Sequence, residues 1–312
     1  MKKATPKLIR GPQIEARSRF FDSARWNDYR PRQDDVIIAT YPKCGTTWTQ
    51  RIVGMLIFQS DAPFAVQDSS PWPDMRIIPA GAAVELAESQ SHRRFLKSHL
   101  PYDALPLYEG VKVIHVARDG RDAAMSFHHH KINYTPEIME RMSQLNVEDP
   151  RFGTPYWKTD PDPAVHFHAW LTDGNEDHLG DPTCGFWYLE NSYWKERSDP
   201  DLLLLHYADL KKDLDGEMRR IAAFLDIPID ESLWPKLVDA ARFESMKNKA
   251  AELMPNAGQI WQGGGNTFLN KGVNGRWRGV LDPADLALYD ERVKQEFSPE
   301  LARWLEFGRL GP

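Results

Sequence analysis

Four short β-rich runs recur along the chain, and helical patterns follow the first, third and fourth of them. The runs are 36–39 (VIIA), 94–98 (RFLKS), 111–116 (VKVIHV) and 202–206 (LLLLH). Strands of a parallel sheet are buried on both faces, so they form continuous apolar segments. Strands that alternate with helices in this way predict an α/β fold, with a central, mostly parallel sheet flanked by helices.

The remaining segments predict one domain over residues 1–312, with an N-terminal extension over 1–28. A single large α/β domain can reach this length, and 41% hydrophobic residues suffice for its core. We expect loops over 60–80 and 146–184, and closing helices after residue 281. The glycine-rich segment 255–281 is either a disordered surface loop or, given its lysine and two arginines, an anion-binding lid.

Composition limits the partners and the location of the protein. The net charge of −6 argues against a nucleic-acid partner, so any polyanion site must be a local basic pocket. Cys44 and Cys184 lack the spacing of a metal site, and so few thiols favour a reducing compartment. The chain starts without a secretory signal, and its run IVGMLIF is too short to span a bilayer. We therefore expect a cytoplasmic protein with no membrane partner.

The stretch TYPKCGTTW, residues 40–48, follows the first predicted strand and suggests a phosphate-binding loop. Gly45 permits a tight turn, and Thr46 and Thr47 open a helix whose free N–H groups attract an anion. Lys43 precedes the glycine, whereas the loop of a magnesium nucleotide site ends in Lys-Ser/Thr. Trp48 either stacks on a purine or is the first core residue of the helix.

Polar side chains follow the other three strands as well. Lys97 and His99 end the second, Arg118 follows the third, and Tyr207 follows the fourth. The carboxyl ends of parallel strands meet at one edge of a sheet, where ligands of open α/β sheets bind. The sequence therefore predicts a site for a polyanion at this edge.

With these residues assembled, the sequence resembles the cytosolic-type sulfotransferases that use 3′-phosphoadenosine 5′-phosphosulfate (PAPS). TYPKCGTTW differs at one position from the family's TYPKSGTTW, and KSHLP (97–101) matches KTHLP. VIHVARDGRDAAMSFHHH, LLHYADLKKD and, less closely, NKGVNGRWR (270–278) match three further family segments in order. The resemblance covers about 29–281 and implies sulfuryl transfer from PAPS to a hydroxyl or amine, with release of 3′,5′-ADP (PAP).

The resemblance also implies roles for individual residues. His99 becomes the general base, and Lys43 and Lys97 stabilise the charge of the transferred group. Arg118, Ser126 and Lys271 are expected to hold the 3′-phosphate. The whole expected donor-binding set comprises Lys43, Cys44, Gly45, Thr46, Thr47, Trp48, Arg118, Ser126, Tyr207, Phe243, Met246, Phe268, Leu269, Asn270, Lys271 and Gly272.

The chemistry supports these roles independently. Charge develops on the equatorial and leaving oxygens during in-line transfer, and fixed cations stabilise it. A histidine can take the acceptor proton at neutral pH. Lysines and helix N–H groups supply the positive field, so we expect no metal. Aromatic residues near the loops favour a small-molecule acceptor, a phenol or a hydrophobic alcohol, over a carbohydrate.

The sequence departs from the family pattern at four positions. Cys44 replaces a serine, Asn270 an arginine, Arg276 an acid, and Ala241 a residue that often carries a hydroxyl. Weaker contact with the 3′-phosphate at Asn270 could be offset by Arg276 or Arg278. The family's dimer motif, KxxxTVxxxE, is not evident after Arg278, so the oligomeric state stays open.

Several other signals have weaker interpretations. The run His128–His130 points in different directions on a helix and lacks a carboxylate partner, which argues against a metal site. His115 is expected in the core, and Cys44 as a ligand contact rather than a nucleophile. Five aromatic residues are either core or the wall of an acceptor pocket: Trp72, Phe127, Trp187, Tyr193 and Trp194. Two other functions stay open, a magnesium-dependent nucleotide kinase or phosphotransferase and a non-catalytic nucleotide-binding protein.

Overall fold

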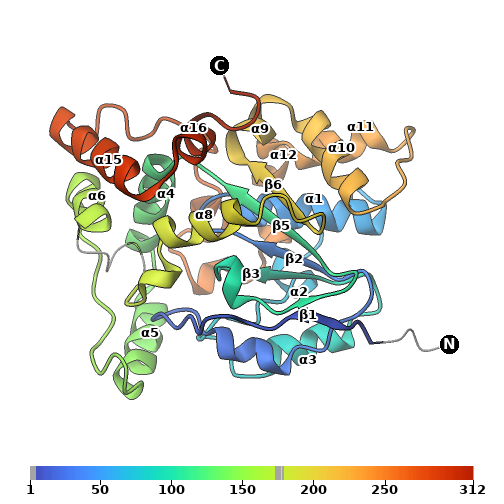
Figure 1. The fold of residues 1–312 in the computed structure, drawn as a ribbon, viewed down its shortest axis with the longest axis horizontal. Helices are drawn as coiled ribbons and strands as arrows, with labels where there is room; N and C mark the ends of the chain where they lie inside the picture. The colour runs from blue at the N-terminus through green and yellow to red at the C-terminus, as the bar shows by residue number, and fades with distance from the viewer. Residues whose placement is uncertain (1–4, 173–176, 178, 312) are drawn as a thin grey trace.

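The computed structural model describes residues 5–172, 177 and 179–311. Its centre is a parallel sheet of β2 (Val36–Ala39), β3 (Phe95–Ser98), β5 (Lys112–Ala117) and β6 (Leu202–His206). The strand order is β3-β2-β5-β6 (Figure 1). All four predicted strands are confirmed; β3 begins one residue later than expected, and β5 is shifted by one residue at both ends.

Each face of the sheet carries its own hydrophobic core. Alternate residues of β2 point to opposite faces, so Val36 and Ile38 join one core and Ile37 and Ala39 the other. The first core is covered by α1 (Thr46–Phe58), α10 (Leu214–Phe224) and α11 (Trp234–Ala241). The second is covered by α4 (Gly120–Ile132) and α8 (Phe186–Lys195). This is the predicted arrangement of a sheet flanked by helices.

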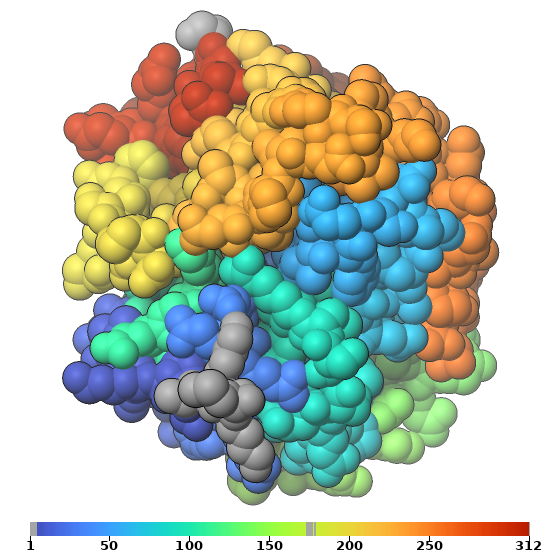
Figure 2. Space-filling model, turned by 90° about the vertical axis from the view of Figure 1, so that its right-hand side faces the viewer, coloured from blue at the N-terminus to red at the C-terminus, as the bar shows by residue number. Residues whose placement is uncertain are grey.

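Segments far apart in sequence meet on the α1 side of the molecule. Figure 2 shows residues of α1 in light blue beside the orange segment that contains α11. The indole Nε1–H of Trp48, in the first turn of α1, donates to the carbonyl oxygen of Ala241 at 2.7 Å. The loop before α1 is therefore tied to the chain that leads into the glycine-rich segment.

Two stretches differ from the expectation. The helical pattern after β6 is broken into α9 (Tyr207–Lys212) and α10, because the Asp213 side chain accepts from the N–H of Gly216 and caps the second helix. The stretch 146–184, expected to be loop-rich, contains α6 (Pro163–Thr172), whose buried side chains include Phe167 and Trp170. Residues 173–176 and 178 of this stretch lie outside the described residues.

The N-terminal segment packs onto the domain. β1 (Leu8–Arg10) pairs antiparallel with β4 (Leu107–Tyr108), and the 3₁₀ helix η1 (Ser23–Asp28) follows. Phe20, Phe21 and Trp26 are each at most 4% exposed. The expected extension 1–28 thus adds to the core from residue 14 onward, while its first four residues lie outside the described part.

The other elements surround this framework. The closing helices α15 (Pro283–Glu296) and α16 (Pro299–Phe307) are confirmed. The glycine-rich segment holds the short α14 (Gly264–Phe268) and is otherwise irregular. The remaining elements are α2 (Val66–Ser69), α3 (Ala82–Ser89), η2 (Tyr102–Ala104), α5 (Pro136–Glu148), η3 (Pro182–Cys184), α12 (Phe243–Asn248), α13 (Ala250–Leu253) and η4 (Ala257–Gln259). Within the described ranges, no helix has the length and apolar character that crossing a bilayer requires.

Candidate active site

A cavity of about 730 Å³ opens at the carboxyl edge of the sheet. All four strands deliver side chains to it: Lys43 follows β2, Lys97 and His99 come from the end of β3, Arg118 follows β5, and Tyr207 follows β6. The side chains that the sequence placed at one edge therefore do line one cavity. Its size is that of a pocket for small molecules.

The loop between β2 and α1 turns sharply at the cavity wall. Lys43 and Gly45 both have positive φ, at 71° and 118°. A Cβ atom on Gly45 would lie 3.1 Å from Cδ2 of Tyr207, so both the backbone and the space favour glycine. The turn directs the first residues of α1, Thr46 and Thr47, into the cavity. This helix N-terminus supplies N–H groups and a positive dipole end to an anion.

The imidazole of His99 is held from the end of β2. Its Nδ1 lies 2.6 Å from the carbonyl oxygen of Thr40. A carbonyl only accepts, so Nδ1 carries the proton and Nε2 has the free lone pair. The Thr40 hydroxyl lies 2.6 Å from that of Thr46 and 3.3 Å from Nδ1 of His99. The base candidate and the start of α1 therefore share one hydrogen-bonded group.

Aromatic rings enclose His99 and keep it neutral. Its ring centroid lies 4.8 Å from that of Trp72 and 5.3 Å from that of Phe21. Burial, with the charges of Lys97 and Lys43 adding to it, lowers the pKa of His99 well below its usual value. The imidazole is therefore unprotonated at neutral pH, as a proton acceptor must be.

The carboxylate of Asp74, which no sequence pattern singled out, holds the residues around His99 in place through three hydrogen bonds. It accepts from the indole N–H of Trp26 at 3.0 Å, the indole N–H of Trp72 at 2.9 Å, and the backbone N–H of His99 at 3.0 Å. Asp74 is fully buried, and burial raises its pKa. The only available signal was an acid two residues after a tryptophan, in a stretch expected to be a loop.

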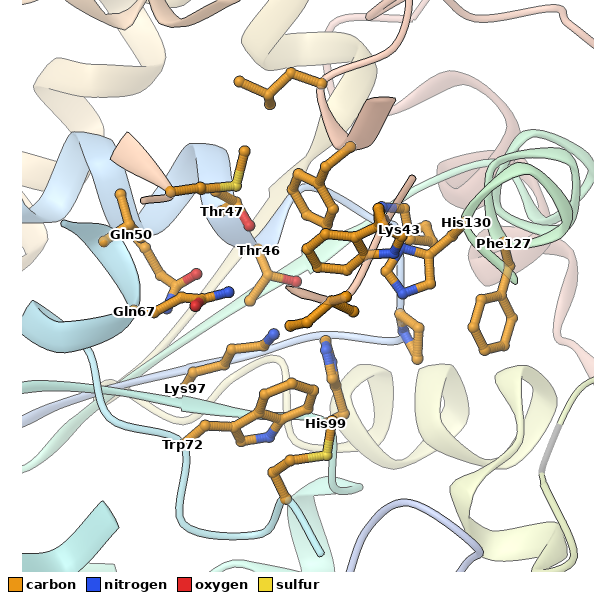
Figure 3. A pocket seen from close by; sticks show the side chains of 18 of the residues that line it. Lys43, Thr46, Thr47, Gln50, Gln67, Trp72, Lys97, His99, Phe127 and His130 are labelled. Atoms are coloured by element: carbon orange, nitrogen blue, oxygen red, sulfur yellow. Dashed lines mark hydrogen bonds between the residues drawn. The ribbon is translucent and has the colours of Figure 1, made fainter. Parts of the chain in front are cut away.

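Lys43 and Lys97 approach the cavity centre from different strands (Figure 3). The ammonium of Lys97 lies 3.3 Å from the ring centroid of Trp72, and that of Lys43 lies 3.9 Å from the ring centroid of Phe268. Burial lowers the pKa of each lysine to about 7; the charges of Lys97 and Arg118 add to the shift at Lys43. An anion bound beside Lys43 and Lys97 would raise the pKa of each lysine, so each ammonium group would become fully protonated.

The cavity wall also includes the residues expected around a nucleotide. Trp48, Tyr207, Phe243 and Met246 line it, and the rings of Trp48 and Tyr207 meet edge to face at 5.4 Å. The guanidinium of Arg118 stacks over Tyr207, with Cζ 4.2 Å from the ring centroid. Its Nε is buried with no hydrogen-bond partner among the described residues. Ser126 also lines the cavity.

Part of the glycine-rich segment lines the cavity, and we call residues 268–276 the lid segment. Its residues Phe268, Leu269, Asn270, Lys271 and Gly272 line the wall, as the resemblance implied. When the amide oxygen of Asn270 faces Arg276 and His129, it accepts from the Arg276 guanidinium at 3.2 Å and from Nε2–H of His129 at 3.3 Å. Arg276, which also lines the cavity, thus stands beside the position where the family has an arginine.

Groups outside the lid fix its backbone. The carboxylate of Asp122, on α4, accepts from the N–H groups of Gly275 at 2.8 Å and Arg276 at 3.1 Å. Arg118 donates to the carbonyl oxygen of Val273 at 3.0 Å and to the side-chain oxygen of Asn274 at 3.1 Å. The lid is therefore anchored to the same strand-end arginine that is expected to bind phosphate.

Some expected residues lie elsewhere. Cys44 is fully buried, does not line the cavity, and donates its N–H to the Tyr41 carbonyl at 3.3 Å. Burial raises the pKa of its thiol well above the usual value, which disfavours a nucleophile. His115 is a core residue that contacts Glu190 at 2.9 Å. Of the five aromatic candidates, Trp72 and Phe127 line the cavity, whereas the other three pack elsewhere: Trp187, Tyr193 and Trp194.

The distribution of carboxylates bears on the kinase interpretation. The described residues that line the cavity include one carboxylate, Glu137 on α5, and none at a strand end. Asp119, which follows β5, pairs with Arg121 at the start of α4 instead. Across the part of the chain that the structure describes, no three His, Cys, Asp or Glu side chains gather as metal ligands. The site lacks the strand-end aspartate that holds magnesium in phosphotransferases.

A large part of the cavity wall is apolar. Side chains from the N-terminal segment, residues 71–86, residues 127–142 and residues 254–261 form it. We call this region the acceptor arm and define it by Phe20, Phe21, Trp72, Met75, Ile77, Ile78, Pro79, Ala82, Ala83, Leu86, Phe127, Tyr134, Ile138, Met142, Met254, Ile260 and Trp261.

Comparison with known proteins agrees with this geometry. Residues 33–300 match the model of the sulfotransferase domain family. The chain is similar to a glycolipid sulfotransferase of Mycobacterium tuberculosis, with 32% identity over 96% of each chain. It is also similar to mouse sulfotransferase 1B1, with 28% identity over 88% of this chain and 86% of the other.

Solved structures share the fold. Mouse sulfotransferase SULT7A1 complexed with PAP has a TM-score of 0.64 at 22% identity, covering 90% of this chain and 91% of its own. Retinol dehydratase in complex with androsterone and PAP has a TM-score of 0.66 at 21% identity, covering 93% and 88%. From the family match and the mycobacterial relative, the chain belongs to the sulfotransferase domain family.

Proposed function

We propose that the protein transfers the sulfuryl group of PAPS to a hydroxyl group of a hydrophobic small molecule, with His99 as the general base. The observation that carries this proposal is the 2.6 Å contact from Nδ1 of His99 to the Thr40 carbonyl. It leaves Nε2 as a lone-pair acceptor in a cavity that Lys43 and Lys97 also line. A neutral, oriented base beside two cations suits the removal of a proton during attack on an anionic donor.

The cavity fits a bisphosphorylated adenosine. The turn at Gly45 and the start of α1 would receive the 5′-phosphosulfate, since helix N–H groups and Lys43 face that point. Arg118, with its buried unpaired Nε, would receive the 3′-phosphate together with Ser126 and Lys271. When bound, the donor supplies a sulfuryl group that is open to in-line attack.

The protein's own side chains supply the general base and the positive charge for the transfer. The acceptor oxygen forms a bond to sulfur as the bond from sulfur to the 5′-phosphate oxygen breaks. His99 takes the acceptor proton at Nε2, and the departing phosphate keeps the electron pair. Lys43 and Lys97 stabilise the charge on the transferred and departing oxygens. The aromatic rings of Trp72 and Phe21 keep water from the base.

The acceptor would occupy the acceptor arm. Its wall is mostly aliphatic and aromatic, which favours a phenol or a hydrophobic alcohol. The dehydratase structure, which contains androsterone, agrees with such an acceptor, whereas the mycobacterial relative is named for glycolipids. The free cysteines Cys44 and Cys184 suit a cytoplasmic location, which we include in the proposal.

The experiment that tests the function measures transfer of ³⁵S from labelled PAPS to a panel of phenols and long-chain alcohols. We expect transfer that persists in EDTA. No transfer to any acceptor, together with calorimetric binding of PAP, would support a non-catalytic nucleotide-binding protein instead. EDTA-sensitive transfer of phosphate from ATP would support the phosphotransferase.

A further inference from the structure

A second imidazole, that of His130, faces the same cavity from the last turn of α4. Its Nδ1 lies 3.3 Å from the ammonium nitrogen of Lys43. Figure 3 shows these two side chains together at one side of the cavity, with His99, Lys97 and Trp72 at another.

The partner of His130 determines where its proton lies. With an anion bound beside it, Lys43 is an ammonium with three N–H donors and no lone pair, so Nδ1 of His130 then accepts. Burial, with the charges of Lys43 and Lys97 adding to it, lowers the pKa of His130 well below its usual value, so the ring is neutral. A neutral imidazole that accepts at Nδ1 carries its proton at Nε2.

The arrangement around His99 is the opposite. There Nδ1 donates to the Thr40 carbonyl, and Nε2 keeps the lone pair. His99 and His130 are therefore neutral imidazoles in different tautomers, one that accepts a proton at Nε2 and one that offers N–H at Nε2. One partner, a backbone carbonyl, sets the first tautomer, and a lysine sets the second.

The surroundings of His130 leave its Nε2–H available. Its ring packs among Trp261 at 4.9 Å, Tyr134 at 5.1 Å and Phe268 at 5.8 Å between centroids. No described residue accepts a hydrogen bond from Nε2. Three of the neighbouring side chains, Trp261, Tyr134 and Phe127, belong to the acceptor arm. A polar N–H in a mostly apolar pocket orients a ligand by its oxygen or nitrogen atoms.

We propose that His130 donates its Nε2–H to a second oxygen atom of the acceptor, adjacent to the hydroxyl that is sulfated. This inference rests on the proposed function and narrows its substrate class. The preferred acceptor is a hydrophobic alcohol or phenol with an ether or hydroxyl oxygen next to the reacting hydroxyl. Lys43 can retain His130 as a partner while its other two N–H groups contact the phosphosulfate, so donor binding and acceptor recognition share this lysine.

The first test uses two acceptors of the same chain length, 2-hexyloxyethanol and nonan-1-ol, which differ by one ether oxygen. A site that hydrogen-bonds a substrate atom rejects the analogue that lacks it, so we expect wild-type kcat/KM to favour the ether alcohol by about tenfold or more. His130→Phe keeps a ring in the aromatic cluster and should remove the preference. His130→Gln, which retains an N–H donor, should restore part of it. Equal ratios in the wild type and in His130→Phe would overturn the inference.

The second test does not require activity. Long-range ¹H–¹⁵N correlation spectra of the histidine-labelled full chain with PAP report the tautomer of each ring, and His130→Phe and His99→Asn assign the signals. We expect a proton at Nε2 on His130 and at Nδ1 on His99. A charged or Nδ1-protonated His130 would overturn the inference even if sulfuryl transfer occurs. The expected tautomer with no sulfuryl transfer to any acceptor would overturn the proposed function, and with it the acceptor role of His130.

Discussion

The imidazole of His99 donates Nδ1–H to the carbonyl oxygen of Thr40, so the end of β2 orients a side chain from β3. The two strands are hydrogen-bonded neighbours in the parallel sheet, in the register Ala39–Ser98. The orientation of the base thus depends on rigid backbone rather than on a mobile side chain. Thr40 also contacts Thr46 in the first turn of α1, which links His99 to the loop between β2 and α1.

Replacing the base should separate chemistry from binding. We expect His99→Ala to lower kcat by about 100- to 10,000-fold, the usual contribution of general base catalysis. PAP affinity, measured by calorimetry, should change little, because the nucleotide contacts lie elsewhere. The matched control is His168→Ala, an exposed histidine of α6. A near-normal rate in His99→Ala would contradict the assignment of the base.

Replacing the carboxylate behind the base should reduce both stability and rate. Asp74→Asn keeps the shape but turns an N–H group toward at least one of the donors from Trp26, Trp72 and the His99 backbone. We expect the free energy of unfolding to fall by about 1–3 kcal/mol, as for an unsatisfied buried polar group. Urea denaturation and kcat measure the two effects. Asp68→Asn, at an exposed position of α2, is the control, and equal stability of both variants would refute this role.

Donor affinity should fall as the pH rises above neutrality. Lys43 and Lys97 have pKa values of about 7 before the donor binds, and an anion raises them, so binding requires proton uptake at higher pH. Above pH 7 the phosphates of PAP are already ionised. From pH 7.5 to 8.5 the dissociation constant should therefore rise about eightfold for each lysine that takes up a proton.

Calorimetry in buffers of different ionisation enthalpy counts those protons directly. Lys97→Met should remove one of them and flatten the pH dependence. Lys195→Met, at the end of α8 and outside the cavity, is the matched control. A dissociation constant that stays level across this pH range would show that both lysines are already charged in the free protein.

Loosening the lid should weaken the nucleotide complex. Asp122→Ala removes the acceptor of the Gly275 and Arg276 N–H groups, so residues 273–276 should become more mobile. We expect PAP binding to weaken by about tenfold, the loss of roughly one charge-assisted hydrogen bond. Hydrogen exchange of this segment should accelerate. Asp290→Ala on α15 is the control, and unchanged exchange in Asp122→Ala would rule out the anchor.

The sheet and the convergence of its strand-end residues were predictable from sequence. Buried parallel strands are continuously apolar, and the carboxyl ends of such strands meet at one edge, so Lys43, Lys97, His99, Arg118 and Tyr207 could be placed together. The donor-binding roles of these residues, which the family resemblance implied, stay predictions for the experiments above.

Other features had no local signal. Asp74 acts through two tryptophans and one backbone N–H that only the tertiary fold brings together. The side chain of Cys44 points away from the cavity, because the positive φ of Lys43 and Gly45 sets the direction of the turn. The pairing of Lys43 with His130 joins a loop to the far end of a helix. Periodicity and propensity report the element that a residue occupies, not the partner that it meets.

The wall formed by the N-terminal segment has a practical consequence. Phe20 and Phe21 line the acceptor arm, and Phe21 packs beside His99, yet the match to the family model begins at residue 33. A fragment that starts at residue 33 would lack Phe20 and Phe21 in the cavity wall, so solvent would reach the imidazole of His99. Boundaries for expression should therefore follow the packing of residues 14–29 rather than the limits of the family match.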